Sequence, residues 1–169
     1  MPDRKLRDIF TKGIKRKFLI IVDETPEGEA ALFYAARRAQ RTGGQLALLY
    51  VIPPPEMSHW LGVEATFREE QVNKARAVFR LYGRKLKNWG FENMQPEEHI
   101  REGQKADEIL KLILDDDAIG VLVLGASTDP AGPGPLVSSL AVGSKVGTFP
   151  VPVTIVPGTL SLKEIEGLA

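Results

Sequence analysis

Short apolar runs alternate along this chain with segments of helical periodicity, and this alternation limits the possible folds more than any other feature. Residues 18–22, 46–52, 119–124 and 151–156 are rich in branched apolar side chains and show no polar alternation. Such runs are typical of strands that are covered on both faces. Residues 97–101 form a more polar run, which predicts a strand at a sheet edge.

Helix signals lie between these runs. Thr25 can serve as an N-cap, Pro26 fits the first helical position, and Gly43 can end the helix. Apolar residues recur at helical spacing within about residues 64–89 and 107–114. Strands that alternate with helices favour a mostly parallel sheet with right-handed crossovers. The predicted fold class is therefore α/β: a doubly wound, five-stranded, mostly parallel sheet with helices on both faces.

Composition bounds the class of protein. A chain of 169 residues with 43% hydrophobic residues suits one domain with a sizeable core. The lack of cysteine excludes a disulfide framework and thiolate metal sites, and it is consistent with a reducing compartment. No apolar stretch approaches the roughly 20 residues needed to span a bilayer, and no signal-peptide core is visible. We therefore expect a soluble, cytoplasmic protein.

Charge is distributed unevenly, although the whole chain is neutral. Residues 1–17 hold seven basic residues against two acidic ones, a net charge of +5, so the remainder carries −5. An acidic body argues against a broad nucleic-acid surface. We treat residues 1–16 as a basic arm, in which four apolar residues recur at near-helical spacing: Leu6, Ile9, Phe10 and Ile14. Such an arm can lie against a partner, an anionic surface or its own domain, and we favour the last.

The ends of three predicted strands indicate where a ligand would bind. In doubly wound sheets, ligands lie outside the carboxyl ends of the strands, where the winding direction reverses. This rule places Asp23, residues 51–55 and the loop after Gly125 on one rim. The loop, residues 124–144, is dense in Gly, Pro, Ser and Thr and leads into a predicted short helix over residues 136–142. It either gathers amide and hydroxyl donors around an anion such as phosphate, or it simply joins two elements.

Five short motifs in order carry a family resemblance: LIIVD at 19–23, LLYV at 48–51, IREG at 100–103, VLVLG at 121–125 and PVPV at 150–153. With these motifs the chain resembles the universal stress protein family. Each motif alone is weak, but their order and spacing match across about residues 17–158. The remaining residues, 159–169, form a tail or short helix, for which the capping box at Ser161 is the start signal.

The resemblance implies more than the fold, which in this family is adenine nucleotide alpha-hydrolase-like. It implies a homodimer formed through the last strand, here residues 151–156. It also implies ATP binding, with Asp23 and Val51 near the adenosine and a loop G-x-x-G-(x9)-G-[ST] around the phosphates. On the residues alone, Asp23 serves equally well as the cap of the following helix. Val51 on the residues alone is a core residue rather than a ligand contact, and only the resemblance assigns it to the site.

The phosphate loop departs from the family pattern. Counting from Gly125, Thr128 stands at the second glycine position and Ser138 and Ser139 stand at the final pair. Aligning Gly143 and Ser144 instead would leave too short a segment before the last strand. The lost glycines make a close backbone wrap less favourable, whereas the serine hydroxyls and the flexible amide of Gly134 compensate in part. Prolines remove three donors from the loop, and residues 125–144 contain no lysine.

Two functions of different classes follow. The first is a dimeric stress-response regulator that binds ATP, with or without Mg²⁺, or a related nucleotide through a variant phosphate loop. The alternative is a structural or interaction dimer that has lost the pocket. Slow ATP hydrolysis is the weakest reading, because the loop offers neither a base nor a cation. We expect no metal site, since His59 and His99 have no partner at ligand spacing, and Trp60 is expected to pack.

Overall fold

The structure, a computed structural model, describes residues 5–54 and 63–169. His59 and Trp60 lie outside the described residues. Five strands form one sheet in the order β3-β2-β1-β4-β5, and every pair is parallel. The strands are β1 (Lys17–Ile21), β2 (Gln45–Ile52), β3 (Glu97–Glu102), β4 (Ile119–Ala126) and β5 (Val153–Pro157). The helices are α1 (Pro26–Thr42), α2 (Val63–Asn88), α3 (Lys105–Asp115) and α4 (Leu162–Leu168), with a π-helical turn η1 (Val137–Ala141) and a 3₁₀ turn η2 (Val146–Thr148).

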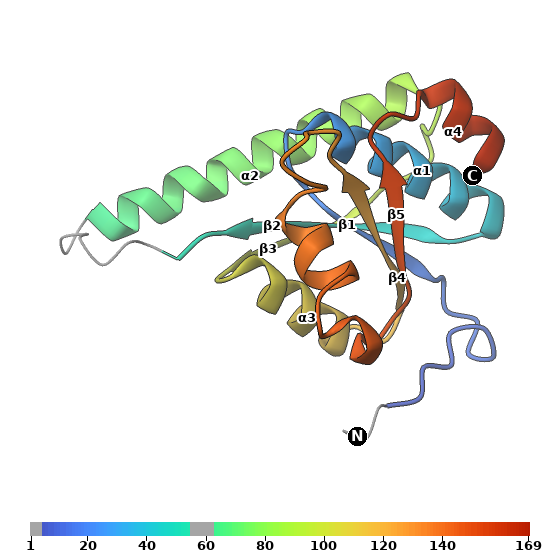
Figure 1. Cartoon of the computed structure of the whole chain (residues 1–169), viewed down its shortest axis with the longest axis horizontal. Coiled ribbons are helices and arrows are strands. Elements are labelled where there is room, and N and C mark those ends of the chain that lie inside the picture. The colour runs from blue at the N-terminus through green and yellow to red at the C-terminus, as the bar shows by residue number, and fades with distance from the viewer. Residues whose placement is uncertain (1–4, 55–62) are drawn as a thin grey trace.

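The predicted fold class is confirmed, and the sheet lies between two helical layers (Figure 1). Side chains alternate along β1: Ile20 packs with α1 and α2 on one face, and Leu19 packs with α3 and η1 on the other. Both side chains are at most 1% exposed. A strand buried on both faces has no polar positions, which explains why the sequence run shows no alternation.

The winding reverses between β2 and β4, the two neighbours of β1. Leu19 of β1 is paired with Ala47 on one side and Leu122 on the other. The chain moves from β1 to β2 and β3 in one direction and then crosses back to β4 and β5. The carboxyl ends of β1, β2 and β4 therefore meet at the switch point, where a ligand site is expected.

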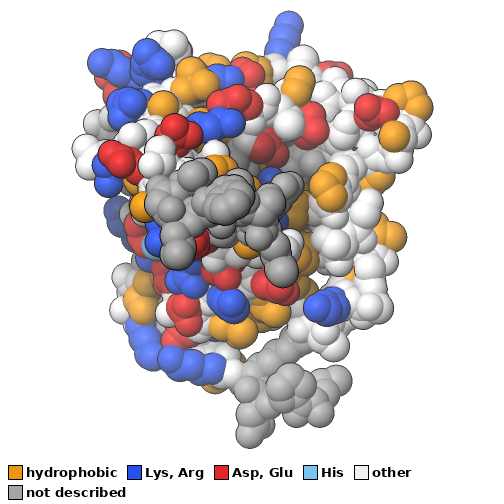
Figure 2. All heavy atoms as spheres, turned by 90° about the vertical axis from the view of Figure 1, so that its left-hand side faces the viewer, with side chains coloured by type: hydrophobic (Ala, Val, Ile, Leu, Met, Phe, Trp, Pro, Cys, Tyr) orange, Lys and Arg blue, Asp and Glu red, His pale blue; other side chains and the backbone are white. Residues whose placement is uncertain are grey.

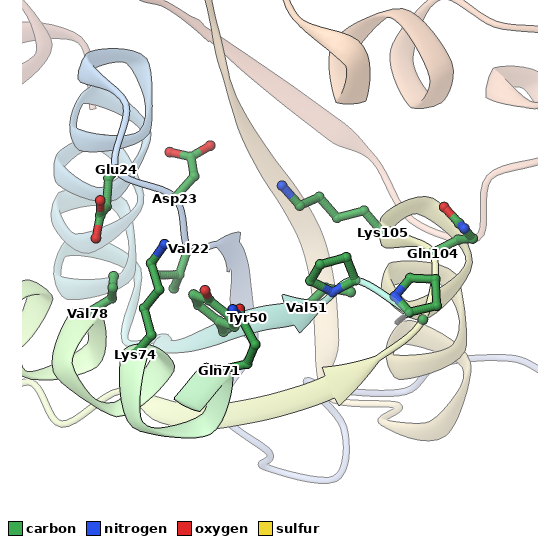
Figure 3. A pocket seen from close by; sticks show the side chains of 13 residues that line it. Val22, Asp23, Glu24, Tyr50, Val51, Gln71, Lys74, Val78, Gln104 and Lys105 are labelled. Carbon is green, nitrogen blue, oxygen red and sulfur yellow. The ribbon is translucent and has the colours of Figure 1, made fainter. Parts of the chain in front are cut away.

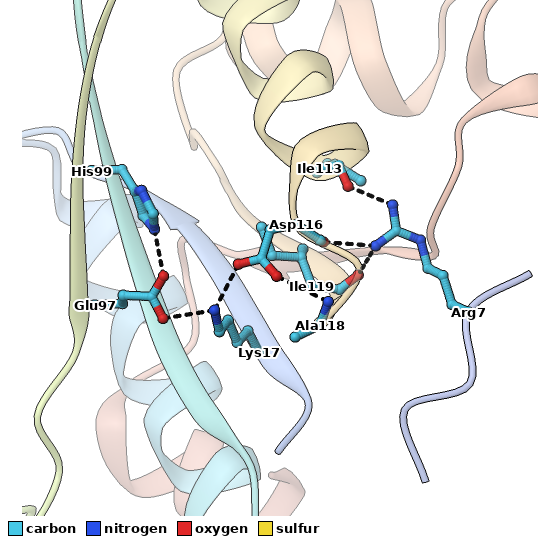
Figure 4. A network of polar contacts seen from close by, with 8 residues as sticks. All are labelled: Arg7, Lys17, Glu97, His99, Ile113, Asp116, Ala118 and Ile119. Atoms are coloured by element: carbon cyan, nitrogen blue, oxygen red, sulfur yellow. Dashed lines mark hydrogen bonds and ion pairs between the residues drawn. The ribbon is translucent and has the colours of Figure 1, made fainter. Parts of the chain in front are cut away.

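A polar network lies at the amino ends of the strands, opposite the rim where the carboxyl ends meet (Figure 4). The Lys17 ammonium lies 2.6 Å from Asp116 and 2.7 Å from Glu97, and Glu97 also contacts the ring of His99 at 2.9 Å. Burial alone would lower the pKa of Lys17, but the bonds to these two carboxylates outweigh it and raise the pKa. The polar run that predicted an edge strand thus joins β3 to β1 and to the end of α3.

The basic arm lies against its own domain, but not as the amphipathic helix that its spacing predicted. Residues 9–13 form turns, and Ile9 is buried whereas Leu6 and Phe10 are exposed. The guanidinium of Arg7 donates to the backbone oxygens of Ile113, Asp116 and Ile119 at 2.5, 2.9 and 2.9 Å (Figure 4). Ile113 lies in the last turn of α3, Asp116 follows the helix and Ile119 begins β4, so Arg7 binds the arm to the junction between α3 and β4.

The capping box expected at Ser161 is present at the start of α4, where the Ser161 hydroxyl accepts from the backbone of Glu164 and the Glu164 carboxylate accepts in return. Arg37 of α1 bonds the Glu166 carboxylate at 2.7 Å, so α4 is held against α1. Across the described ranges, no helix combines the length and apolar character needed to cross a membrane.

Candidate functional site

A cavity of about 540 Å³ opens at the carboxyl ends of β1 and β2, and we call it the main cavity. Its walls are the ends of these two strands, the side of α2 and the turn between β3 and α3. Asp23, Tyr50 and Val51 line it, so the structure places two of the predicted site residues on one rim. Its volume lies within the range usual for small-molecule sites.

Asp23 is held in place by contacts on two sides. Its Oδ1 accepts from the backbone N–H of Thr25 at 3.2 Å and from the Thr25 hydroxyl at 2.6 Å. The Tyr82 hydroxyl of α2 donates to the backbone oxygen of Asp23 at 2.5 Å and accepts from its N–H at 3.3 Å. Burial and the nearby Asp23 charge raise the pKa of Tyr82, so its phenol stays protonated.

The start of α1 explains why Asp23 can also serve a ligand. Thr25, not Asp23, is the N-cap, and its side chain accepts from the backbone N–H of Gly28 at 3.1 Å. A Cβ at Gly28 would stand 2.2 Å from Asp23 Oδ1, so only glycine fits beneath this carboxylate. Asp23 Oδ2 has no hydrogen-bond partner among residues 5–54 and 63–169, and Asp23 lines the main cavity.

A second, smaller cavity of about 210 Å³ lies under the loop after β4, and we call it the loop cavity. Asp23 lines it too, together with Gly125, Gly134 and two of the loop prolines, Pro133 and Pro135. Gly134 has φ +105°, a conformation that favours glycine. The structure therefore brings Gly125 and Gly134 to the same hollow as Asp23.

Gly125 has a structural reason to be glycine. A Cβ at this position would stand 2.0 Å from the backbone oxygen of Glu27 and 2.4 Å from its carbonyl carbon. The end of β4 therefore passes directly against the first turn of α1. This close approach accounts for the glycine without any phosphate contact.

Three other predicted loop residues lie outside both cavities. Thr128, Ser138 and Ser139 are exposed and line neither the main nor the loop cavity. Ser138 and Ser139 belong to η1, which buries Val137 and directs these two serines outward. The assignment of these three residues to a ligand site stays a prediction, and their positions do not favour it.

Two lysines that sequence reasoning missed line the main cavity. Lys74 comes from α2 and Lys105 is the first residue of α3, and both side chains extend into the space beside Asp23 (Figure 3). Lys105 also lines the loop cavity. A signal was available for Lys105, because it follows the turn at Gly103 and so lies at the carboxyl end of a predicted strand.

The face that carries this rim shows acidic and basic side chains intermixed. Figure 2 views the molecule from that side, and neither charge forms a continuous field over its described part. No group of three or more potential metal-ligating side chains occurs within the described ranges. The rim thus offers an open, mixed-charge cavity, with one fixed carboxylate and two lysines.

Comparison with known proteins gives a family and a fold. The model of the universal stress protein family matches residues 15–157. The universal stress protein UspA from Lactobacillus plantarum has a TM-score of 0.60 at 20% identity, covering 83% of this chain and 97% of that one. No curated protein matches the chain at a significant level of sequence similarity.

Two further similar structures were solved with nucleotides. A universal stress protein in complex with cAMP has a TM-score of 0.59 at 19% identity, covering 86% of this chain and 98% of that one. One from Archaeoglobus fulgidus in complex with dAMP has a TM-score of 0.53 at 17% identity, covering 83% of this chain and 96% of that one. At these identities the likeness establishes the α/β fold.

Proposed function

Because the chain belongs to the universal stress protein family, we propose that it binds ATP or a related adenine nucleotide in the main cavity. The observation that carries the proposal is the position of this cavity at the winding reversal, with Asp23 fixed beside Val51 on its wall. The free oxygen of Asp23 suits the hydroxyls of a ribose or the amine of a base. The cAMP and dAMP complexes of similar structures support the same ligand class.

In this proposal, Val51 contributes to nucleotide binding through the shape that it gives the cavity and through its backbone groups. It is 7% exposed and packs in the core between the sheet and α3, yet it also lines the main cavity. Tyr50, its neighbour on β2, supplies an aromatic side chain to the same wall. An apolar strand end beside a fixed carboxylate suits a ligand that has a flat base and a polar sugar.

We further propose that the protein acts as a homodimeric regulator in a stress response, with the nucleotide altering its contacts with partners. β5 is an edge strand that pairs, among residues 5–54 and 63–169, with β4 alone, and Ile155 on it is 39% exposed. Beside it lies an apolar groove of about 380 Å³ that includes Val146 and Phe149. Analytical ultracentrifugation of the full chain tests this assembly, and a monomer at tens of micromolar would contradict it.

A ligand-free interaction dimer is the second candidate, and one observation favours it. Prolines line the loop cavity while Ser138 and Ser139 point outward, so the loop offers fewer donors than the family pattern around phosphates. Native mass spectrometry of the purified protein separates the two functions. A nucleotide mass retained on most molecules would exclude the ligand-free candidate.

Calorimetric titration with ATP and Mg²⁺ tests nucleotide binding directly. In Asp23→Asn the remaining amide oxygen still accepts from Thr25, but the charge is lost, so we expect about a tenfold weaker affinity. Asp129→Asn is the matched control, because Asp129 is an exposed loop carboxylate that lines neither cavity. No heat of binding to the wild-type protein would refute the proposal.

A further inference from the structure

We propose that Lys74 and Lys105 hold the phosphate groups of the nucleotide, a role that the loop after β4 is poorly built to perform. This inference rests on the proposed function, and it names the chemistry of the ligand: an adenine nucleotide bound through the negative charge of its phosphates. The two lysines reach the main cavity from different elements, Lys74 from α2 and Lys105 from the start of α3.

Neither ammonium group is paired with a carboxylate in the described part of the chain. Within the described ranges, neither Lys74 nor Lys105 forms an ion pair or a side-chain hydrogen bond, whereas Lys17, Lys85 and Lys111 each contact a carboxylate within 3.0 Å. Figure 3 shows both side chains directed into the cavity, Lys74 from the side of α2 and Lys105 from the side of α3. A cation that projects into a cavity without a protein partner is available to an anionic ligand.

The carboxylates of the cavity do not occupy the same place. In Figure 3 the Glu24 carboxylate lies on the side of α1, away from Lys105, and the Asp23 carboxylate lies at the top of the opening, with the Lys74 ammonium directed between the two. Asp23 Oδ1 is bound by Thr25. The cavity therefore presents the free oxygen of Asp23, which can accept from sugar hydroxyls, and two ammonium groups that enter from different sides and can bind phosphates.

The loop itself offers less to a phosphate. Two of the residues that line the loop cavity are prolines, which have no N–H to donate. Lys105 is the one lysine among the residues that line this cavity, and it also lines the main cavity. Phosphates that extend from the main cavity toward the loop would thus pass this ammonium group.

The experiment compares a ligand with phosphates to one without them. The wild-type protein and the variants Lys74→Gln and Lys105→Gln are titrated by calorimetry with ATP and with adenosine, at low and moderate salt. Lys87→Gln is the control, because Lys87 is an exposed lysine on the same helix as Lys74 but lines no cavity described above. Lys105→Arg keeps the charge and tests for rescue.

We expect each lysine removal to weaken ATP binding about tenfold or more and to leave adenosine binding unchanged. ATP binding should also weaken with salt in the wild type, and less steeply in the variants. Lys105→Arg should retain most of the ATP affinity. Because both lysines are exposed, none of these substitutions should move the urea midpoint of unfolding appreciably.

The outcomes separate this inference from the function on which it rests. If the wild type binds neither ATP nor adenosine, both proposals fall. If ATP binds equally well to the wild type and to both lysine variants, only the role of the lysines is refuted and nucleotide binding stands. If adenosine binding is lost together with ATP binding, the lysines shape the cavity and do not hold phosphate, which also overturns the inference.

Discussion

Replacing Gly125 by alanine separates the two roles that a glycine at this position can have. The new Cβ would stand 2.0 Å from the backbone oxygen of Glu27, about 1.4 Å short of the 3.4 Å at which ordinary contact begins. The obstacle is backbone in the first turn of α1, so it cannot rotate away as a side chain would. Either β4 or α1 must shift, and both carry buried core residues.

Overpacking of this kind costs about 1–3 kcal/mol, and a collision with backbone belongs at the upper end. For a chain of this size, about 3 kcal/mol corresponds to a melting temperature lower by roughly 6–12 °C. Urea and thermal unfolding followed by circular dichroism measure the loss. Gly83→Ala is the matched control: Gly83 lies in α2 with nothing within 4 Å of its added Cβ, so alanine should stabilise by about 0.5–1 kcal/mol.

The refuting result is a Gly125→Ala protein as stable as the wild type, since the clash would then be relieved without cost. The variant also informs the binding site. If Gly125 serves packing, the folded fraction of Gly125→Ala should bind ATP with nearly wild-type affinity. If stability is unchanged but ATP binding is lost, the glycine is needed for the ligand and our packing argument is wrong.

Two further predictions concern buried polar contacts. Tyr82→Phe leaves the backbone groups of Asp23 without their partner and should lower the free energy of unfolding, measured by urea denaturation, by about 1–3 kcal/mol. Tyr34→Phe is the control and should lower it less, because the Tyr34 hydroxyl has no hydrogen-bond partner in the described part of the chain. Because the pKa of Tyr82 is raised in the folded protein, its contribution to the free energy of unfolding is complete below the ordinary tyrosine value of about 10 and is lost as the pH rises above that value. The urea midpoint of Tyr82→Phe should therefore decline less at alkaline pH than that of the wild type. Arg7→Gln should lower the free energy of unfolding by about 1–3 kcal/mol and speed amide hydrogen exchange at the end of α3. Lys12→Gln is the control, and an Arg7→Gln effect no larger than the effect of Lys12→Gln would show that the arm is not docked through Arg7.

The strands could be predicted from the sequence because their burial is encoded in consecutive residues. Leu19 and Ile20 face opposite layers and are both buried, so the whole run must be apolar wherever it lies in the sheet. Glu97 and His99 can be polar because β3 lies at the edge of the sheet, where a strand is less completely buried. The motif at Ser161 predicted its helix start because all of its hydrogen bonds lie within four residues.

The arm and the loop show where local pattern was insufficient. Near-helical spacing predicted a helix around Ile9, but the backbone oxygens at the end of α3 bind Arg7, and turns place both residues against the domain. The prediction that Ser138 and Ser139 lie at the rim rested on matching the family's loop pattern from Gly125. The need to bury Val137 turned the helix so that both serines face outward.

By itself, the sequence determined the α/β class, the number of strands and their order along the chain, the edge position of β3 and the presence of Asp23 at the end of β1. Only the tertiary structure decided which side chains share the cavity, including Lys74 and Lys105, and what obstructs a Cβ at Gly125. The physical reason is the sequence separation over which each kind of interaction acts. Burial and capping act between residues a few positions apart, whereas the rim is assembled from the ends of elements separated by tens of residues, whose relative positions depend on packing of the whole domain.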